Sequence, residues 1–166
     1  MCLLLEDFLA IGTIKINKDI LDFNFLLEEV ISNYNNLIKE KHIFLKQDIT
    51  DEEIYVIGDY NRLVQVFINI IKNAIESIEL DGCLHIKTKV VKQNIIVSIK
   101  DNGIGMSEET LSKIREPFYT TKRKGSGLGI PLSYNIIEAH EGSMEYLSKE
   151  GYGTEVIIKL PIFDVK

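Results

Sequence analysis

The chain has 166 residues, of which 45% are hydrophobic and 27% are charged, a composition typical of a globular domain with a substantial core. This composition excludes an intrinsically disordered chain, a collagen-like fibre and a disulfide scaffold. With 19 Lys and Arg against 25 Asp and Glu, the net charge is −6, which argues against a general nucleic-acid-binding protein.

The first predicted element is the end of a helix over residues 1–12. Leu4, Phe8 and Ile11 follow at the i, i+4, i+7 spacing of one helical stripe, and Gly12 ends the pattern. The residues that follow offer no obvious apolar surface for this stripe. We therefore expect residues 1–12 to be the tail of a helix that belongs to an upstream segment, and residues 13–166 to form a separate domain.

The next segments predict a helix, two strands and a second helix. Asn24 is expected to cap a helix over residues 25–41, and residues 43–49 and 54–58 read as strands. Residues 60–80 carry the strongest helical pattern, because one apolar stripe continues through Leu63, Phe67, Ile70, Ile71, Ala74 and Ile78.

The second half of the chain alternates hairpin-linked strands with short helices. Strands are expected over residues 83–91, 95–101, 143–148 and 154–160, and helices over residues 107–115 and 127–140. Gly142 is expected to end the last helix in the left-handed conformation. This order predicts an α/β two-layer sandwich, in which a mixed, mostly antiparallel sheet is covered on one face by helices. A doubly wound Rossmann fold is excluded, because strands and helices do not alternate regularly.

The polar face of the 60–80 helix is the first candidate site. Asn69 and Asn73 are four residues apart, so their side chains stack on one face. Asn is a mediocre helix former, and its amide oxygen is a hard, neutral ligand suited to Mg²⁺ that already carries phosphate. An ordinary solvated helix face is the alternative.

A carboxylate at the end of a buried strand is the second candidate. Asp101 shares the inward face of its strand with three apolar residues and is followed by Gly103 and Gly105. A buried carboxylate needs a partner, and at the mouth of a pocket it could accept a hydrogen bond from an exocyclic amine such as adenine N6. The Asn102-Gly103 pair could instead mark a simple hairpin turn, although the next segment is helical.

A glycine-rich loop, Gly125-Ser126-Gly127-Leu128-Gly129, is the third candidate. Glycines before a helix leave backbone N–H groups available for phosphate, and Lys122, Arg123 and Lys124 add three adjacent positive charges. The spacing matches neither the Rossmann fingerprint nor the P-loop, so a flexible linker is the alternative.

Together these motifs resemble those of the ATP-binding domain of bacterial sensor histidine kinases, which are Bergerat-fold ATPases, and especially those of sporulation-type kinases. The resemblance covers roughly residues 20–161. It rests on the order of five motifs: Asn69-xxx-Asn73, Asp101-x-Gly103-x-Gly105, Pro117-Phe118-Tyr119-Thr120-Thr121-Lys122, Gly125-x-Gly127-x-Gly129 and Gly151-x-Gly153-Thr154.

The resemblance implies a role for each matching residue. Asn73 would hold Mg²⁺ with Asn69 beside it, and Asp101 would recognise adenine with a water near Thr154. Lys122 and Arg123 would reach the β- and γ-phosphates of ATP, and Phe118 would anchor the lid against dimerisation helices. The residues expected to shape the pocket and lid are Gly103, Gly105, Gly125, Gly127, Leu128 and Gly129.

The implied reaction transfers the ATP γ-phosphoryl group to a histidine nitrogen. The family's acceptor is a His followed by an acidic residue in a dimerising helix, and His42, His85 and His140 all lack that context. The chain therefore resembles the catalytic half of a longer, homodimeric kinase, with a separate dimerisation domain and a response regulator as partners. We expect a cytoplasmic domain for three reasons. The sequence has no apolar run of roughly 18 residues and no basic secretory N-terminus, and its two thiols, Cys2 and Cys83, are isolated.

Two other functions remain open from the sequence. A stand-alone serine kinase of the anti-sigma type shares the fold, but the apolar start of the chain and the Thr120-Thr121-Lys122 lid argue against it. A non-catalytic, nucleotide-dependent binding module is the second, but such a domain should have lost Asn73 or Asp101.

Overall fold

The computed structural model describes residues 14–164, so the helix tail expected over residues 1–12 lies outside the described residues. The helices are α2 (Phe23–Ser32), α3 (Asn35–Glu40), α4 (Tyr60–Ser77), α5 (Glu108–Lys113) and α6 (Gly129–Ala139). The strands are β1 (Asp19–Asp22), β2 (Phe44–Asp48), β3 (Tyr55–Gly58), β4 (Cys83–Val91), β5 (Asn94–Asp101), β6 (Ser143–Lys149) and β7 (Gly153–Pro161). Within this part of the chain, no helix has the length and apolar character that a membrane span requires.

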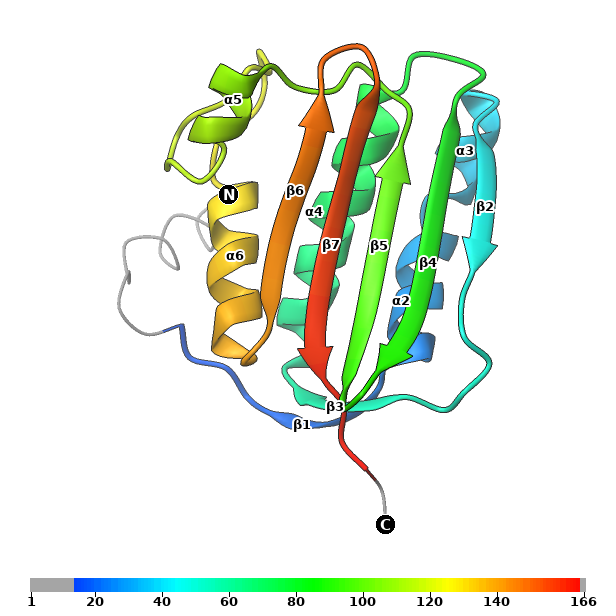
Figure 1. The fold of residues 1–166 in the computed structure, drawn as a ribbon, viewed down its shortest axis with the longest axis vertical. Coiled ribbons are helices and arrows are strands. Elements are labelled where there is room, and N and C mark those ends of the chain that lie inside the picture. Colours follow the sequence, from blue (N-terminus) through cyan, green and yellow to red (C-terminus); the bar gives the residue numbers. More distant parts are fainter. Residues whose placement is uncertain (1–13, 165–166) are drawn as a thin grey trace.

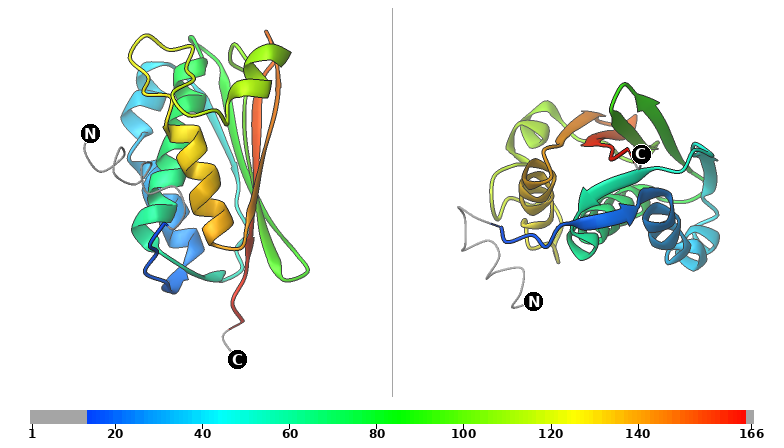
Figure 2. Two further views of the ribbon diagram at one scale, coloured as in Figure 1. Left: turned by 90° about the vertical axis from the view of Figure 1, so that its left-hand side faces the viewer. Right: turned by 90° about the horizontal axis from the view of Figure 1, so that it is seen from below.

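The main sheet has five strands in the order β2-β4-β5-β7-β6 (Figure 1). Strand β2 runs parallel to β4, and every other neighbouring pair is antiparallel. A second sheet pairs β1 with β3 in antiparallel register at the lower end of the molecule. Figure 2 shows the large helices together on one face of the main sheet, so the predicted two-layer sandwich with a mixed, mostly antiparallel sheet is confirmed.

The core forms where the apolar stripe of α4 meets the inward face of the sheet. The predicted members of that stripe are all buried, and Phe67 packs edge-on against Phe23 of α2 with ring centroids 5.6 Å apart. Along β5 the inward residues alternate with the outward ones, so Ile95, Val97 and Ile99 are buried. Asp101 continues this inward series and is therefore carried to the upper end of the core.

The helix expected over residues 25–41 is wrong in its start and in its continuity. It begins at Phe23, and its cap is Asp22, whose carboxylate accepts a hydrogen bond from the backbone N–H of Phe25. The Asn24 side chain instead donates to the carbonyls of Thr50 and Glu52, and so ties α2 to the following loop. The helix breaks after Ser32 and resumes as α3, and the strand β1 was not expected at all.

The end of α6 also differs from the expectation. Glu141, with φ of 60°, takes the left-handed conformation that was assigned to Gly142. Gly142 is needed for a close approach, because a Cβ there would lie 2.4 Å from the carbonyl oxygen of Lys159. The glycine was identified correctly as a helix end, but its role is to let the chain pass against β7.

Candidate functional site

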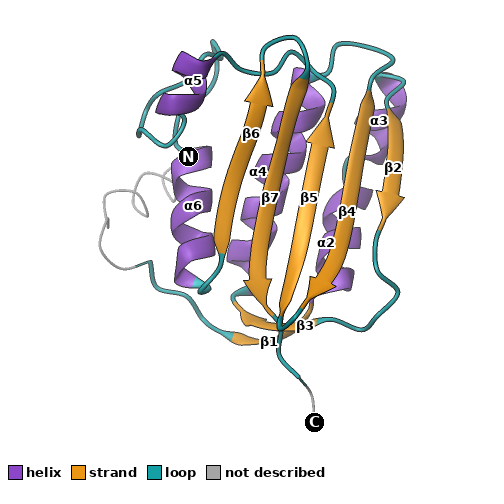
Figure 3. Cartoon of the chain, in the orientation of Figure 1, coloured by secondary structure: helices purple, strands orange, loops and turns teal. Residues whose placement is uncertain are grey.

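The candidate site lies at the upper end of the sandwich in Figure 1, where the end of β5, the last turns of α4 and the start of α6 meet. We call residues 117–126 the lid. Figure 3 shows this loop between α5 and α6, and the left view of Figure 2 shows that it lies on the helical side of the sheet. Three segments that are distant in sequence therefore bring the predicted site residues together.

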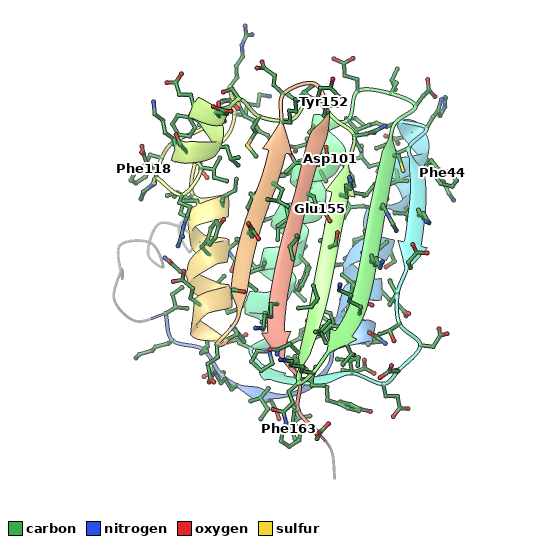
Figure 4. All side chains as sticks on the ribbon, in the orientation of Figure 1. Phe44, Asp101, Phe118, Tyr152, Glu155 and Phe163 are labelled. Carbon is green, nitrogen blue, oxygen red and sulfur yellow. The ribbon has the colours of Figure 1, made fainter. Side chains whose placement is uncertain are left out.

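Asp101 is held as a buried acceptor. Its side chain lies near the upper end of β5 (Figure 4), and the residue is only 4% exposed. Its Oδ1 accepts hydrogen bonds from Gly103 N (2.8 Å), Ser77 Oγ (3.1 Å) and Thr154 N (3.3 Å). Burial raises the pKa of the Asp101 carboxyl above its usual value, and these hydrogen bonds act in the opposite direction. Because all three bonds reach Oδ1, Oδ2 is the oxygen left to accept an N–H from a ligand.

The glycines around Asp101 permit close backbone packing. Gly105 has φ of +64°, and a Cβ there would lie 2.0 Å from the carbonyl oxygen of Lys149, the last residue of β6 before the β6–β7 turn. A Cβ on Gly103 would lie 2.3 Å from Ser77 Oγ, the same hydroxyl that holds Asp101. The segment after β5 is therefore pressed between α4 and the β6–β7 turn, which fixes the surroundings of the carboxylate.

The two asparagines of α4 have different surroundings. Asn69 Nδ2 donates to Ser133 Oγ of α6 at 3.2 Å. A Cβ on Gly129 would lie 2.3 Å from Asn69 Oδ1, so α6 approaches α4 closely at this point. Asn73, one turn later, points its Oδ1 at the lid, where it accepts a hydrogen bond from Lys122 Nζ at 3.0 Å. Asn69 thus fixes α6, and Asn73 faces a cation.

The lid is a tight loop with a charged tip. Lys122 also pairs with the carboxylate of Glu76 on α4, and its backbone N–H donates to Thr120 Oγ1 at 3.0 Å. A Cβ on Gly125 would lie 2.5 Å from the same Thr120 oxygen, so this turn is compact. Arg123, by contrast, is exposed on the loop.

The base of the lid is anchored by Gly127, which follows it directly in the glycine-rich loop. Gly127 has φ of +70°, and a Cβ there would lie 2.4 Å from the backbone carbon of Phe118. The Phe118 N–H donates to the Gly127 carbonyl at 3.0 Å, while the residue is 60% exposed. Leu128 is buried and precedes the first turn of α6, and its N–H donates to Ser126 Oγ at 3.3 Å. The glycine loop therefore packs against the base of the lid and leads directly into α6.

The side chains near Asn73 fit a metal ion that is already bound to the phosphates of a nucleotide. Among the described residues, no three His, Cys, Asp or Glu side chains cluster in a way that could hold a metal ion. Asn73 and Glu76 nevertheless direct oxygen atoms at one cation, the Lys122 ammonium. Mg²⁺ is bound in proteins through one or two such oxygens plus phosphate oxygens of the substrate, so this donor set fits a nucleotide-borne Mg²⁺.

Three residues of this region were not predicted to be part of the site. Ser77 fixes Asp101, and Glu76 pairs with Lys122, although Glu76 could be recognised as a member of the polar face of α4. Ser148 Oγ accepts from the Met106 N–H at 2.9 Å and hydrogen-bonds the Thr154 hydroxyl at 2.8 Å. Serines carry no sequence signal for such contacts, because each depends on a partner distant in the chain.

The three histidines lie in structural or surface positions. His140 is buried at the lower end of α6, where its Nδ1 donates to Ile136 O (2.7 Å) and its Nε2 accepts from Asp59 N (2.8 Å). Burial lowers the pKa of His140, in keeping with a neutral ring. His85 Nε2 lies 2.6 Å from Asp48 Oδ2 on the sheet, and His42 is largely exposed beside Asp81.

Comparisons with known proteins give a consistent result. Residues 58–163 match the family described as histidine kinase-, DNA gyrase B-, and HSP90-like ATPase. The chain is 40% identical to sporulation kinase E of Bacillus subtilis (strain 168) over 138 residues, which are 82% of this chain and 19% of that kinase. The catalytic domain of histidine kinase ThkA matches with a TM-score of 0.79 and 31% identity, over 87% of this chain and 95% of that domain. ThkA in complex with the response regulator protein TrrA matches with a TM-score of 0.80 and 26% identity, over 97% of this chain and 47% of the matched chain.

Proposed function

Since the chain belongs to the family of histidine kinase-, DNA gyrase B-, and HSP90-like ATPases, as the catalytic ATPase domain of a two-component sensor histidine kinase, we propose that it binds Mg²⁺-ATP and donates the γ-phosphoryl group to a histidine on a dimerisation domain. The chain spans about a fifth of the length of sporulation kinase E, so the acceptor, the response regulator and a cytoplasmic location are parts of this proposal. One observation carries it: a buried carboxylate acceptor and a cation-binding asparagine lie at the same end of the sandwich.

Asp101 provides the adenine end of the proposed site. Its Oδ2 would accept a hydrogen bond from the adenine N6 amine while three donors hold Oδ1. Thr154 helps to fix the carboxylate and would also position a water beside the base. Gly103 and Gly105 allow the backbone to lie against a flat ring without Cβ atoms in the way.

The phosphate end combines α4 with the lid. Asn73 would hold Mg²⁺ beside Asn69, and Lys122 and Arg123 would contact the β- and γ-phosphates. The residues that would shape the lid around the phosphates are Gly125, Gly127, Leu128 and Gly129. Phe118, exposed on the lid, would contact the dimerisation helices.

In the proposed transfer, the bond between the γ-phosphorus and the β–γ bridging oxygen breaks, a phosphorus–nitrogen bond to the acceptor histidine forms, and ADP leaves. When bound, Mg²⁺ neutralises phosphate charge. The chain's own residues would position the nucleotide: Asp101 fixes the base, and Lys122 places a positive charge beside the transferred group.

The other two functions have less support. One similar solved structure is the catalytic domain of histidine kinase ThkA, which does not favour a serine acceptor. Asn73 and Asp101 are both present at the site, which does not favour a degenerate binding module. The complex of ThkA with the response regulator protein TrrA supports a response regulator as the downstream partner.

The test is phosphoryl transfer between separate proteins. The chain is incubated with γ-labelled ATP and Mg²⁺, with and without a dimerisation domain from a sporulation-type kinase. We expect an acid-labile, base-stable label on the dimerisation domain and none on the chain alone. An acid-stable label on a protein serine would favour the serine kinase, and a label on His42, His85 or His140 would contradict the proposed division of roles.

A further inference from the structure

Glu76 lies one turn after Asn73 on the polar face of α4, and both side chains face the lid. Lys122 Nζ donates to Asn73 Oδ1 at 3.0 Å and also contacts Glu76 Oε2. Two oxygens from one helix, one neutral and one charged, therefore converge on a single positive nitrogen. The contact between Lys122 and Glu76 joins positions that are 46 residues apart in the chain.

The neighbours of Glu76 leave one of its carboxylate oxygens available to the Lys122 ammonium. Lys72 approaches Glu76 Oε1 from the preceding turn at 3.9 Å, a distance that leaves Oε2 for the lid. Tyr34 also lies near Glu76, and burial and then the charge of Glu76 raise the pKa of Tyr34. The Glu76 side chain is 38% exposed, so it has room to move toward a second cation in the site.

The contacts of Lys122 are incompatible with those expected of it in a nucleotide complex. The oxygen of Asn73 that faces the lid cannot bind the ammonium and a metal ion in the same position. Lys122, in turn, cannot pair with Glu76 and a phosphate in the geometry that the structure has. Binding of a metal-nucleotide therefore requires one cation to replace another against α4.

We propose that Asn73 and Glu76 form a two-oxygen cation site that Lys122 occupies in the empty domain and that nucleotide-bound Mg²⁺ takes over. This inference rests on the proposed function and adds Glu76 to it as the second protein oxygen for the metal. Glu76 supplies a carboxylate, which Mg²⁺ prefers to a neutral amide alone. Displacement of Lys122 by the metal also releases that lysine for the phosphates, so metal binding and lid closure are coupled.

The variant Glu76→Gln tests the proposal, since it keeps the size of the side chain and removes its charge. Glu79→Gln is the matched control, because it makes the same change three positions later, on an exposed residue just beyond α4. In the empty protein, trypsin should cleave the lid after Lys122 or Arg123 about two- to fivefold faster in Glu76→Gln than in the control. That range follows from the modest strength of a partly exposed ion pair.

The second measurement is nucleotide affinity with and without Mg²⁺. In Glu76→Gln, the gain in ATP affinity on adding Mg²⁺ should fall about tenfold, while metal-free affinity stays equal or rises because Lys122 is released. An unchanged Mg²⁺ gain together with unchanged lid cleavage would overturn the inference and leave the proposed function intact. If the unmodified chain bound no nucleotide, the proposed function would fail and the metal role of Glu76 with it, while the cleavage experiment would still decide whether Glu76 holds the lid.

Discussion

Asp101 and Lys122 lie at the same end of the sandwich, but the first residue is 4% exposed and the side chain of the second is 45% exposed. Asp101 is fixed by backbone and hydroxyl donors from three segments, with no counter-charge among these contacts. The ammonium of Lys122 is held by the side chains of Asn73 and Glu76, and the second of these is a surface carboxylate. A carboxylate fixed in this way costs little to reorganise on binding, whereas the lid has partners that it must exchange.

If Asp101 and Lys122 have the roles proposed above, base recognition is built into the empty fold, and phosphate recognition is completed when the ligand binds. Changes at the Asp101 end should therefore cause large losses that do not depend on metal. Changes at the lid end should cause smaller losses that depend on Mg²⁺ and on the γ-phosphate.

The largest effect is expected from Gly105→Ala. A residue with a Cβ is destabilised by roughly 1–2 kcal/mol in the left-handed conformation. A Cβ 2.0 Å from the carbonyl oxygen of Lys149 would also force the backbone to move, which costs about 1–3 kcal/mol more. The melting temperature should fall by about 2–4 °C for each kcal/mol. Gly151→Ala is the control, because Gly151 also has a positive φ of +79° but nothing within 4 Å of the added Cβ. Equal losses in the two variants would mean that the approach to Lys149 is not tight.

The next effect is expected from Asp101→Asn. The amide can direct a donor at another donor, and an unsatisfied buried polar group costs about 1–3 kcal/mol, so affinity for both ATP and ADP should fall roughly tenfold or more. Calorimetry measures this loss, with Asp48→Asn on the exposed edge strand as the control. Unchanged affinity in a folded Asp101→Asn variant would remove the adenine assignment.

A smaller and conditional effect is expected from Asn73→Ala. One polar contact contributes about 0.5–1.5 kcal/mol, so affinity for Mg²⁺-ATP should fall about three- to tenfold, and affinity for metal-free ATP should change less. Titrations with and without Mg²⁺ separate the two. Equal losses in both conditions would mean that Asn73 has a structural role, like the one that Asn69 has toward α6.

The smallest effect concerns pH and the packed end of α6. Burial lowers the pKa of His140 below 6.5, so the unfolded chain takes up a proton first as pH falls. The stability that the neutral ring contributes is complete above about pH 6.5, and it is lost as pH falls from that value toward the lowered pKa. The free energy of unfolding should fall by no more than about 1.4 kcal/mol per pH unit in this range. Urea unfolding at pH 7.5 and 5.5 should show a weaker pH dependence in His140→Gln than in the unmodified chain. His42→Gln, at an exposed position, should keep the original dependence.

Periodic patterns predicted the parts of this structure that depend on local sequence. The apolar stripe of α4 and the alternation along β5 were sufficient to place Asp101 at the end of a buried strand. Local signals failed where either of two nearby residues could fill one structural role. Asp22, not Asn24, caps α2, and Glu141, not Gly142, adopts the left-handed conformation.

The contacts that define the candidate site could not be predicted in the same way. Ser77 reaches Asp101 across 24 residues, and Glu76 reaches Lys122 across 46. Such pairs depend on how α4 packs against the sheet and on where the lid lies, and neither has a periodic signal. The motifs predicted the candidate residues, and the fold determines which of them are in contact.

Hydrogen exchange of the backbone amides tests the difference between the two ends most directly. The amides of Gly103 and Thr154 donate to Asp101, so they should exchange slowly in the empty domain and change little on binding. Exchange across residues 117–129 should slow more with a non-hydrolysable ATP analogue than with ADP, because the cations of the lid respond to the γ-phosphate. Lys122→Ala should remove most of that difference. A lid that is equally protected in the empty, ADP-bound and analogue-bound states would contradict this account.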